Sequence, residues 1–328
     1  MPIPNDDLKR EWIDGSNNNP NLVDIYRPCL VAFLALNKDH VPIFAGSGFI
    51  IGSNGEFAFA LTAKHVLTEQ VLSIQRPSPR HAPSALPFFI PVSSTIPSIE
   101  ESKLRAMWTD FNNADLLFTR HVGYNDNFDI ACTLLEAQPA LKDNFKPSSI
   151  LLDANEPAIG DVVRMISLDK LEINNYTPPT DISGAGFTFR ANRRVSIRLG
   201  TVTGVYPKGY RQYKWPCFTT SIPAEPGMSG GMVCLHADNG PISVCGIVCA
   251  DASTDEARVN NTLCGESIIA SAWTSLSLSL PEAIELNPPM ISIYHLMKDD
   301  KLPAANGLEN ITYIDNGNGN WSITNMKS

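Results

Sequence analysis

Short apolar runs separated by turn-forming residues make up most of the chain from Tyr26 onward. They include CLVAFLAL, GSGFIIG, EFAFALTA and DIACTLL, followed by DVVRMISL, PCFTTSI, GGMVCLH and ISVCGIVCA. Val, Ile and Phe at this spacing, with Gly, Asn and Asp between the runs, are typical of β-strands in a barrel or sandwich. The pattern therefore predicts an all-β protein with two packed antiparallel β-barrels of about six strands each and few short helices.

Breaks in this pattern divide the chain into segments. Polar residues rich in Asn and Pro predict an N-terminal arm over 1–25, followed by a first barrel over 26–138. The segment LEAQPALKDNFKPSS favours a linker at 139–149, which leads into a second barrel over 150–285. The C-terminal extension, 286–328, contains NITYIDNGNGNWSIT, in which an Asn-Gly turn joins two alternating runs and predicts a β-hairpin outside the main core.

Four shorter segments give local expectations. The prolines within 73–98 cannot serve a central strand and predict a long surface loop or insertion. GSNGEF predicts a hairpin turn at Asn54 and Gly55. GESIIASAWTSLSLSL, at 265–280, is the best helix candidate. RANRRVSIR, at 190–198, predicts a solvated strand face, with binding of an anion or a partner as the alternative.

Composition and charge exclude some functions. The 328 residues are 43% hydrophobic and 18% charged, with a formal net charge of −9 at pH 7. Nucleic-acid binders usually present a basic face, so this charge argues against nucleic acid as the main partner. The N-terminal segment lacks the pattern of a secretory signal, and no apolar run reaches the roughly 18 residues of a membrane-spanning helix. We therefore expect a cytoplasmic protein with no membrane partner.

The cysteines fit a reducing compartment. Most of them lie in apolar, strand-like runs, where reduced cysteine behaves as a small hydrophobic residue. The sequence has no C-x-x-C pair, and no histidine stands at ligand spacing from the cysteines of SVCGIVCA, so we expect neither a metal site nor a cofactor. The cysteines are Cys29, Cys132, Cys217, Cys234, Cys245, Cys249 and Cys264.

One serine stands between glycines in EPGMSGGMVC, at 225–234, just before an apolar run. A Gly-x-Ser-Gly-Gly segment is typical of a tight β-turn, because glycine adopts positive φ without steric cost. The same segment could also present a nucleophilic serine. Serine reacts at neutral pH only when a base takes its proton and a third group orients that base. Ser229 therefore has two interpretations, and a suitably placed histidine and carboxylate favour the second.

His65 and Asp129 are candidates for that pair. His65 follows an apolar strand in FAFALTAKHVL, and Asp129 precedes another in NDNFDIACTLLE, where a carboxylate needs a hydrogen-bonding partner. The structural alternatives are a surface or core histidine and a strand-capping carboxylate. Asp115, in NNADLLF, is the alternative carboxylate. We prefer Asp129, because the strand that follows Asp129 leads into the linker.

These segments resemble the ordered motifs of the trypsin-like serine proteases of the chymotrypsin clan. GSGFIIGSNGEFAFALTAKHV resembles the strands that end in LTAAHC or LTNNHV, FDIACTLLE resembles DIAVLKL, and EPGMSGGMV resembles GDSGGPL or PGNSGGPL. The order His, Asp, Ser is that of the clan, and the resemblance covers roughly residues 26–280. It is closest to the bacterial HtrA-type protease domains, although the remaining C-terminal segment is too short for their PDZ module.

The resemblance implies a role for each residue. Ser229 would attack the scissile carbonyl, His65 would relay the proton to the leaving amine, and Asp129 would orient the imidazole. The backbone N–H groups of Gly227 and Ser229 would form the oxyanion hole, which contributes about 3 to 4 kcal/mol per donor in related chemistry. Met228 stands where the digestive enzymes have an Asp that pairs with a newly cleaved N-terminus, so activation by N-terminal cleavage is not expected.

The resemblance also implies a substrate-binding pocket. Pro223 would lie at its base and Ala224 in one of its walls, while Cys249, Ala250 and Asp251 would form another wall and an edge strand to which an extended substrate adds. Because Pro223 replaces the Asp that selects Lys or Arg, we expect small or medium apolar residues before the scissile bond. An acidic side chain such as Asp251 pointing into the pocket is the alternative.

The sequence therefore favours a serine endopeptidase that hydrolyses peptide bonds through an acyl-enzyme intermediate. Its expected substrate is a protein or peptide, and its expected setting is that of a regulated intracellular bacterial protease. A regulatory protein is an expected second partner, because a free protease in the cytoplasm needs restraint. The alternative is a trypsin-like scaffold or binding protein with weak turnover, which a fluorophosphonate probe would distinguish by failing to label Ser229.

Overall fold

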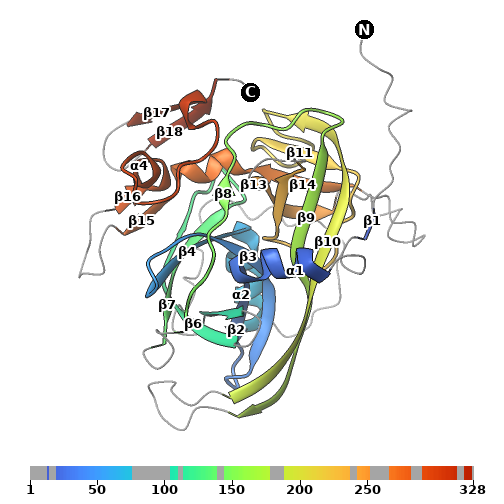
Figure 1. Ribbon diagram of the computed structural model, residues 1–328, viewed down its shortest axis with the longest axis vertical. Helices are drawn as coiled ribbons and strands as arrows, with labels where there is room; N and C mark the ends of the chain where they lie inside the picture. Colours follow the sequence, from blue (N-terminus) through green and yellow to red (C-terminus); the bar gives the residue numbers. More distant parts are fainter. Residues whose placement is uncertain are drawn as a thin grey trace.

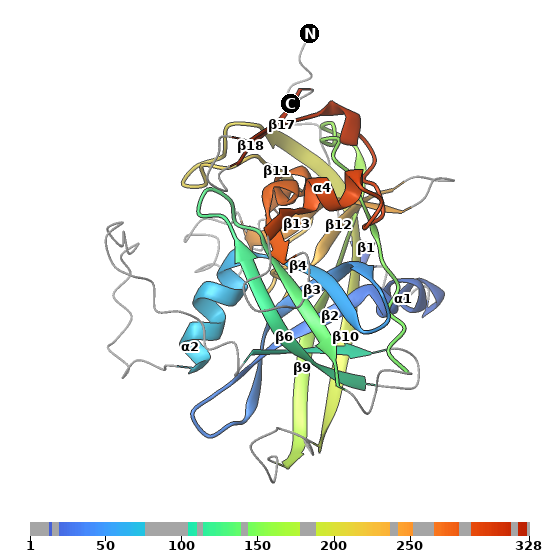
Figure 2. The ribbon, with the colours of Figure 1, turned by 90° about the vertical axis from the view of Figure 1, so that its left-hand side faces the viewer.

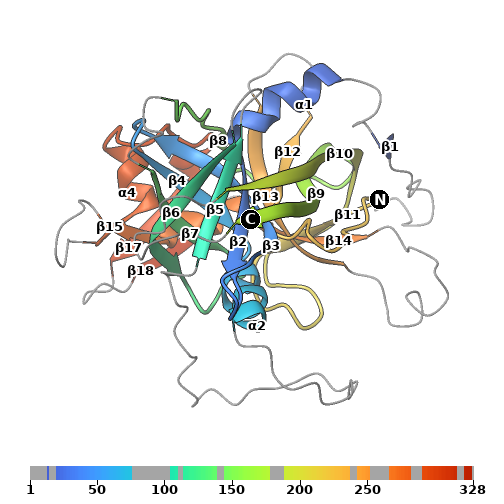
Figure 3. The same ribbon diagram turned by 90° about the horizontal axis from the view of Figure 1, so that it is seen from below.

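The computed structural model consists of two β-barrels packed side by side, with a C-terminal extension against them (Figure 1). The view from below separates the barrel made by the first half of the chain from the barrel made by the second half (Figure 3). The described residues are 13–14, 20–75, 104–109, 114–138, 144–177, 188–236, 242–251, 266–281, 290–315 and 321–326.

The first barrel is built from strands of the first half of the chain. These strands are β2 (Leu30–Leu36), β3 (Pro42–Ser53), β4 (Phe57–Thr62), β5 (Leu104–Thr109), β6 (Ala114–Tyr124) and β7 (Ala131–Ala137). The barrel closes in the order β2-β3-β4-β7-β6-β5, and each neighbouring pair is antiparallel. Every residue of β2 is buried, which explains why its sequence LVAFLAL is apolar without alternation.

The second barrel is built from strands of the second half. These strands are β9 (Val162–Thr177), β10 (Thr188–Tyr206), β11 (Cys217–Thr220), β12 (Met232–Leu235), β13 (Ser243–Asp251) and β14 (Ser267–Ser271). They follow the order β10-β11-β14-β13-β12-β9, and antiparallel pairing of β9 with β10 closes the ring. Short strands β1 (Ile13–Asp14) and β8 (Leu151–Leu152) pair with β10 and β13. The predicted all-β double barrel is confirmed.

Strands β9 and β10 are longer than their neighbours and continue past the second barrel alongside the first (Figures 1 and 2). Their pairing extends from Val162 with Thr201 to Thr177 with Thr188. The hydroxyl of Tyr176 donates a hydrogen bond to the carbonyl oxygen of His40 at 2.5 Å. This contact ties the long hairpin to the turn between β2 and β3.

The hairpin turn predicted at Asn54 and Gly55 is confirmed. Strands β3 and β4 pair antiparallel on either side of it, and Gly55 has a φ of 87°. The side-chain oxygen of Asn54 accepts hydrogen bonds from the backbone N–H groups of Glu56 at 3.1 Å and Phe57 at 2.8 Å. Asn and Gly therefore fill the turn for the reasons that predicted it: local side-chain capping and tolerance of positive φ.

Helices in the described structure are short. They are α1 (Pro20–Tyr26), η1 (Arg27–Cys29), η2 (Val66–Gln70), α2 (Val71–Gln75), η5 (Ala272–Ser277), α4 (Ile293–Lys298) and η6 (Leu308–Asn310). Because β1 and α1 are regular elements, part of the arm predicted over 1–25 belongs to the fold. The Pro-rich segment predicted over 73–98 lies outside the described residues except for its beginning, which ends α2.

The helix predicted over 265–280 is wrong. The segment forms β14, then the 3-10 helix η5, then β15 (Ser279–Pro281). Ile268 and Ile269 pair with both β11 and β13, because β-branched side chains pack well on a sheet surface. The hydroxyl of Ser275 donates to the carbonyl oxygen of Ala272 at 2.7 Å, so the serines serve a tight turn instead of a continuous α-helix.

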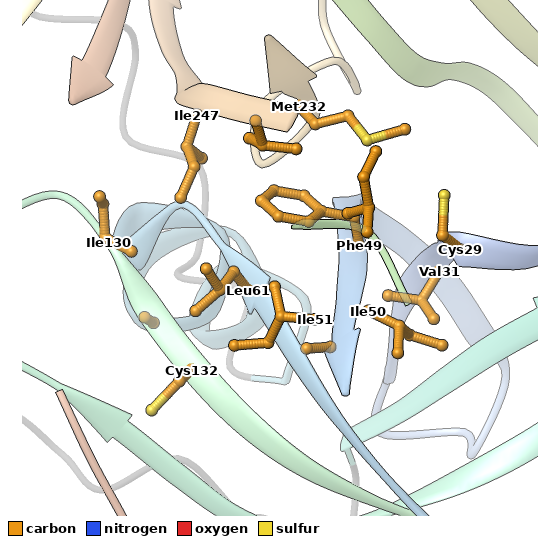
Figure 4. Packing of buried hydrophobic residues seen from close by; sticks show 14 of the residues in the cluster. Cys29, Val31, Phe49, Ile50, Ile51, Leu61, Ile130, Cys132, Met232 and Ile247 are labelled. Carbon is orange, nitrogen blue, oxygen red and sulfur yellow. The ribbon is translucent and has the colours of Figure 1, made fainter. Parts of the chain in front are cut away.

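Two hydrophobic clusters fill the molecule. The larger cluster occupies the first barrel and crosses the contact between the barrels, where Phe49 points toward Met232 and Ile247 of the second barrel (Figure 4). The smaller cluster lies in the second barrel and contains Phe218 and Met228. Met228 is fully buried, so the residue preceding Ser229 belongs to the interior of the second barrel.

The C-terminal extension contains β16 (Met290–Ser292), β17 (Ile311–Asp315) and β18 (Trp321–Asn325), and it covers one end of the molecule (Figure 2). Antiparallel pairing of β17 with β18 confirms the predicted hairpin. The prediction that it lies outside the main core is wrong. Ile311 of the hairpin belongs to the larger hydrophobic cluster, Ile323 packs against that cluster, and the side-chain amide of Asn325 donates to the carbonyl oxygen of Ala154 at 2.7 Å.

Six cysteines lie in the described part of the chain, and each is buried with a free thiol; Cys264 lies outside it. Burial raises the pKa of Cys29, Cys132 and Cys217 to about 12, so these thiols stay protonated at neutral pH and pack as apolar groups. Within the described ranges, no group of three or more His, Cys, Asp or Glu side chains could hold a metal ion. The helices described here are all too short or too polar to cross a membrane.

Candidate active site

Strand pairing in the first barrel brings His65 beside Asp129. Strands β4 and β7 run antiparallel, with Thr62 at the end of β4 opposite Ala131 at the start of β7. His65 follows Thr62 closely along the chain, and Asp129 closely precedes Ala131, so the two side chains meet at the same end of the strand pair. The competing carboxylate, Asp115, lies on β6 opposite Trp108 of β5.

Hydrogen bonds fix the relative orientation of His65 and Asp129. The Asp129 carboxylate accepts from the backbone N–H of His65 at 3.0 Å through Oδ1 and from the ring Nδ1 of His65 at 2.8 Å through Oδ2. The backbone N–H of Lys64 donates to the carbonyl oxygen of Asp129 at 3.2 Å. Because an ionised carboxylate only accepts, the proton of the neutral ring lies on Nδ1, and Nε2 is left as the basic nitrogen.

The environment of His65 sets its basicity. Burial lowers the pKa of His65, because an imidazolium is poorly solvated there. The hydrogen bond to Asp129 and the negative charges of Asp129 and Glu69 raise the pKa, and their combined effect leaves it above the ordinary histidine value. The two partners are 18% and 16% exposed, so solvent screens their interaction only in part. A base of this kind suits removal of a proton from a hydroxyl.

The segment that leads into Ser229 forms a type II β-turn over 225–228. The N–H of Met228 donates to the carbonyl oxygen of Glu225 at 3.0 Å. Pro226 occupies the second position, where its ring keeps φ negative, and Gly227 occupies the third with a φ of 93°. In type II turns the central peptide is turned over relative to type I, so this φ determines the direction in which the Gly227 N–H points.

A second turn of the same type follows immediately. The N–H of Gly231 donates to the carbonyl oxygen of Met228 at 2.9 Å, and Gly230, at the third position, has a φ of 83°. The N–H of Gly230 donates to Val248 of β13 at 2.8 Å, which attaches the turn to the second barrel. Ser229 therefore sits at the second position of a tight turn, so the structural and chemical interpretations of this serine are compatible.

Two amides of this double turn are unpaired. The N–H groups of Gly227 and Ser229 donate to no described residue, whereas those of Met228, Gly230 and Gly231 each donate to a backbone carbonyl. Gly227 and Ser229 are half-buried. Backbone amides without an acceptor in such a position would bind a negatively charged oxygen.

Ser47 of β3 joins the turn to the first barrel. Its N–H donates to the carbonyl oxygen of Ser229 at 2.8 Å. Its hydroxyl accepts from the N–H of Leu168 at 2.9 Å and lies 3.0 Å from the carbonyl oxygen of Gly227 and 3.1 Å from that of Leu168, so its single proton can go to either. Ser47 was not among the predicted site residues, although a serine between two glycines in an apolar strand was a signal.

Ser229 and His65 come from different barrels, and Gly46 lies between their segments. A Cβ on Gly46 would be 2.7 Å from Cγ2 of Val66, the residue after His65, and 3.1 Å from the carbonyl oxygen of Ser229. Only glycine lets the two segments approach this closely. The Ser229 hydroxyl makes no hydrogen bond with His65 or any other described residue, and catalytic hydrogen bonds often tighten only when substrate binds.

A hollow of about 700 Å³ opens beside His65 and Asp129, and both barrels line it. Phe128 from the first barrel and Tyr213 and Trp215 from the second give it aromatic walls. Such a mixture of aromatic and titratable groups is typical of ligand-binding hollows.

Two of the predicted substrate-binding residues, Cys249 and Ala250, also line this hollow. Strand β12 pairs with β13 only as far as Ile247. C-terminal to Ile247, β13 pairs with β14 on one side and has no described strand on the other side. Asp251 ends this open edge, and its side chain lies outside the described part. The backbone of β13 therefore offers an edge of the kind to which an extended peptide adds.

The other two, Pro223 and Ala224, precede the turn. Pro223 is buried, and Ala224 packs against the smaller hydrophobic cluster. The carbonyl oxygen of Pro223 accepts a hydrogen bond from Nη1 of Arg198 at 2.9 Å. Arg198 is 2% exposed, so the solvated face predicted over 190–198 is wrong at this position. It shares a strand face with the core residue Val202, because positions an even number apart point the same way.

Sequence comparisons do not identify the chain. Profiles of known protein families give no match, and no curated protein sequence matches it. A function has therefore to be inferred from the arrangement of His65, Asp129 and the Ser229 turn.

Proposed function

We propose that the protein is a serine endopeptidase of trypsin-like type, with Ser229 as nucleophile. The observation that supports this most is the pair of hydrogen bonds that attach the Asp129 carboxylate to the backbone and ring of His65. The segment after His65 and the Ser229 carbonyl both approach Gly46 closely. An orienting carboxylate, a base and a serine are the groups that acyl transfer needs.

The reaction follows from these positions. The Ser229 hydroxyl attacks the carbonyl carbon of a peptide bond as Nε2 of His65 takes its proton, and the amides of Gly227 and Ser229 receive the oxygen that becomes negative. The carbon–nitrogen bond then breaks, and His65 returns the proton to the departing amine. Water attacks the resulting ester with His65 again as base, which releases the acid and restores Ser229.

Substrate orientation is supported by the open edge of β13. A peptide lying along Cys249 to Asp251 pairs with this strand through its backbone and places its side chains over the hollow beside His65. The buried Pro223 has no charge to offer a basic side chain, so we propose a preference for small or medium apolar residues before the cut.

Hydrolysis of a peptide library, with the cut sites identified by mass spectrometry, tests this function. We expect cleavage that depends on both Ser229 and His65 and that follows apolar residues. Dominant cleavage after Lys or Arg would overturn the proposed preference. Absence of any cleavage, with peptides still bound, would support a trypsin-like binding protein instead.

A further inference from the structure

A buried arginine contacts the segment that leads into the Ser229 turn. Arg198 of β10 is 2% exposed. Its Nη1 donates to the carbonyl oxygen of Pro223 at 2.9 Å, its Nη2 lies 2.8 Å from Oε1 of Glu225, and its Nε donates to the hydroxyl of Ser196 at 3.2 Å. A planar guanidinium with three directed contacts holds its partners in a fixed geometry.

Glu225 connects this contact to the chemistry of the turn. It is the first residue of the turn over 225–228, and its carbonyl oxygen accepts the hydrogen bond that closes the turn. Its own N–H lies 3.3 Å from Sδ of Met228. Arg198 therefore holds the first residue of the turn by its side chain and the chain just before it by the Pro223 carbonyl.

The other residues of the turn, 226–228, have no charged side chain that could hold the turn in place. Met228, at its last position, is a neutral thioether packed in the smaller hydrophobic cluster. Gly227 has no side chain, and Pro226 is exposed. Since glycine adopts positive and negative φ with similar ease, Gly227 by itself does not restrict the peptide before it to one orientation.

We propose that the Arg198–Glu225 ion pair locks the turn over 225–228 so that the Gly227 N–H stays aimed at the reacting oxygen. Arg198 and Glu225 are then positioning residues, because neither touches the substrate. The catalytic part of this proposal rests on the proposed peptidase function. The structural part, in which the ion pair restrains the turn, does not.

Two readouts on one variant separate these parts. In Glu225→Ala, the Met228 and Gly231 amides that close the two turns should exchange hydrogen about tenfold faster than in the native chain, because a charge-assisted hydrogen bond contributes a factor of this order. The rate of Ser229 labelling by a fluorophosphonate should fall by about 10- to 100-fold, short of the loss of a whole oxyanion donor. Glu225→Gln, which keeps an acceptor for Arg198, should recover part of both.

Glu136→Ala is the matched control. It removes the partner of Arg120 in the first barrel and so breaks another arginine–glutamate pair away from the turn. Its labelling rate and the exchange of the turn amides should match those of the native chain. Glu225 variants are preferred to Arg198 variants, because Glu225 is 37% exposed and its loss leaves the barrel interior filled.

The outcomes differ for the two proposals. Unchanged exchange and unchanged labelling in Glu225→Ala would overturn the lock and leave the peptidase function intact. Faster exchange with no labelling of any chain would support the lock and contradict the peptidase function. Equal losses of labelling rate and of amide protection in Glu225→Ala and Glu136→Ala would show that the Arg198–Glu225 pair only stabilises the fold in general. That result would overturn its positioning role.

Discussion

The two barrels hold their parts of the candidate site by different means. The first barrel supplies His65 and Asp129, which are fixed by direct hydrogen bonds between a ring, a carboxylate and the backbone. The second barrel supplies Ser229, which is placed by two turns with positive φ at Gly227 and Gly230. One half depends on side-chain chemistry, the other on backbone conformation.

This difference determines how each half can fail. Loss of the Asp129 carboxylate removes the group that orients His65, whereas a rotation of one peptide near Gly227 would misdirect an amide while every side chain stays present. A site divided in this way can be chemically complete and still inactive. Under the proposed function, restraint of the turn by its surroundings is therefore as important as the presence of His65, Asp129 and Ser229.

The largest effect is expected on removal of either reactive group. Ser229→Ala and His65→Ala should each lower kcat by about 10⁶-fold, because nucleophile and base act as one unit. The double variant should be no worse than either single variant. Steady-state hydrolysis of a peptide found in the cleavage profile measures all three, and losses that multiply would show that the residues act independently.

Asp129→Asn should lower kcat by about 10⁴-fold, since the amide stabilises the wrong tautomer of His65. The proposed mechanism requires neutral His65, so activity should rise as pH increases through the histidine pKa. That pKa is raised largely by Asp129 against the effect of burial, and the rising limb should therefore move to lower pH in the variant. Asp126→Asn, which removes the 79% exposed partner of Lys64, should leave the profile nearly unchanged.

The same pair predicts a pH dependence of stability. The raised pKa of His65 means that folding favours its protonated form. This stabilisation is present below the ordinary histidine pKa and is lost as pH rises through the raised value. Asp129→Asn should reduce the loss, as thermal unfolding at several pH values would measure. Identical pH dependence in both chains would contradict the role of Asp129 in raising this pKa.

Gly227→Ala should act on the other half of the site. The variant should lower kcat by about 10²- to 10³-fold, as does removal of one oxyanion donor, because a φ of 93° is unfavourable for alanine. Gly55→Ala is a matched control, with a φ of 87° and no atom within 4 Å of the added Cβ. Both changes should cost about 1 to 2 kcal/mol of unfolding free energy. Equal turnover in the two variants would contradict the role of the Gly227 turn.

The smallest effect is expected at Met228. Met228→Leu should retain activity and lose less than about 1.5 kcal/mol of unfolding free energy, because a buried side chain is replaced by one of similar volume. Met228→Asp should destabilise the second barrel more, since it buries a charge in an apolar cluster. Chemical denaturation gives both values, and a Met228→Asp chain more stable than native would show that a charge at this position finds a partner.

Much of the fold was predictable from local patterns. Alternating or continuous apolar runs indicated the strands, and Asn54 with Gly55 indicated a hairpin that the structure contains. The contacts of His65 with Asp129 follow from antiparallel pairing of β4 and β7, because His65 comes just after β4 and Asp129 comes just before β7. These features depend on residues close in sequence or on a single strand pair.

The remaining features depend on contacts between distant segments. Within the serine-rich run, β14 (Ser267–Ser271) joins the second barrel by pairing with β11 and β13, which the composition of the run does not indicate. Arg198 is charged and yet buried, because Glu225 and the Pro223 carbonyl receive it there. Ser47 links the two barrels because the fold brings β3 beside Leu168 and Gly227, which contact the Ser47 hydroxyl. Tertiary packing decides each of these cases against local preference.

Covalent labelling tests the central claim most directly. The native chain is incubated with a fluorophosphonate, digested, and its modified peptide identified by mass spectrometry. We predict a single adduct on Ser229, absent from Ser229→Ala and His65→Ala and formed faster as pH rises through the raised pKa of His65. An unlabelled native chain, or an adduct formed equally well without His65, would contradict the assignment of Ser229 as an activated nucleophile.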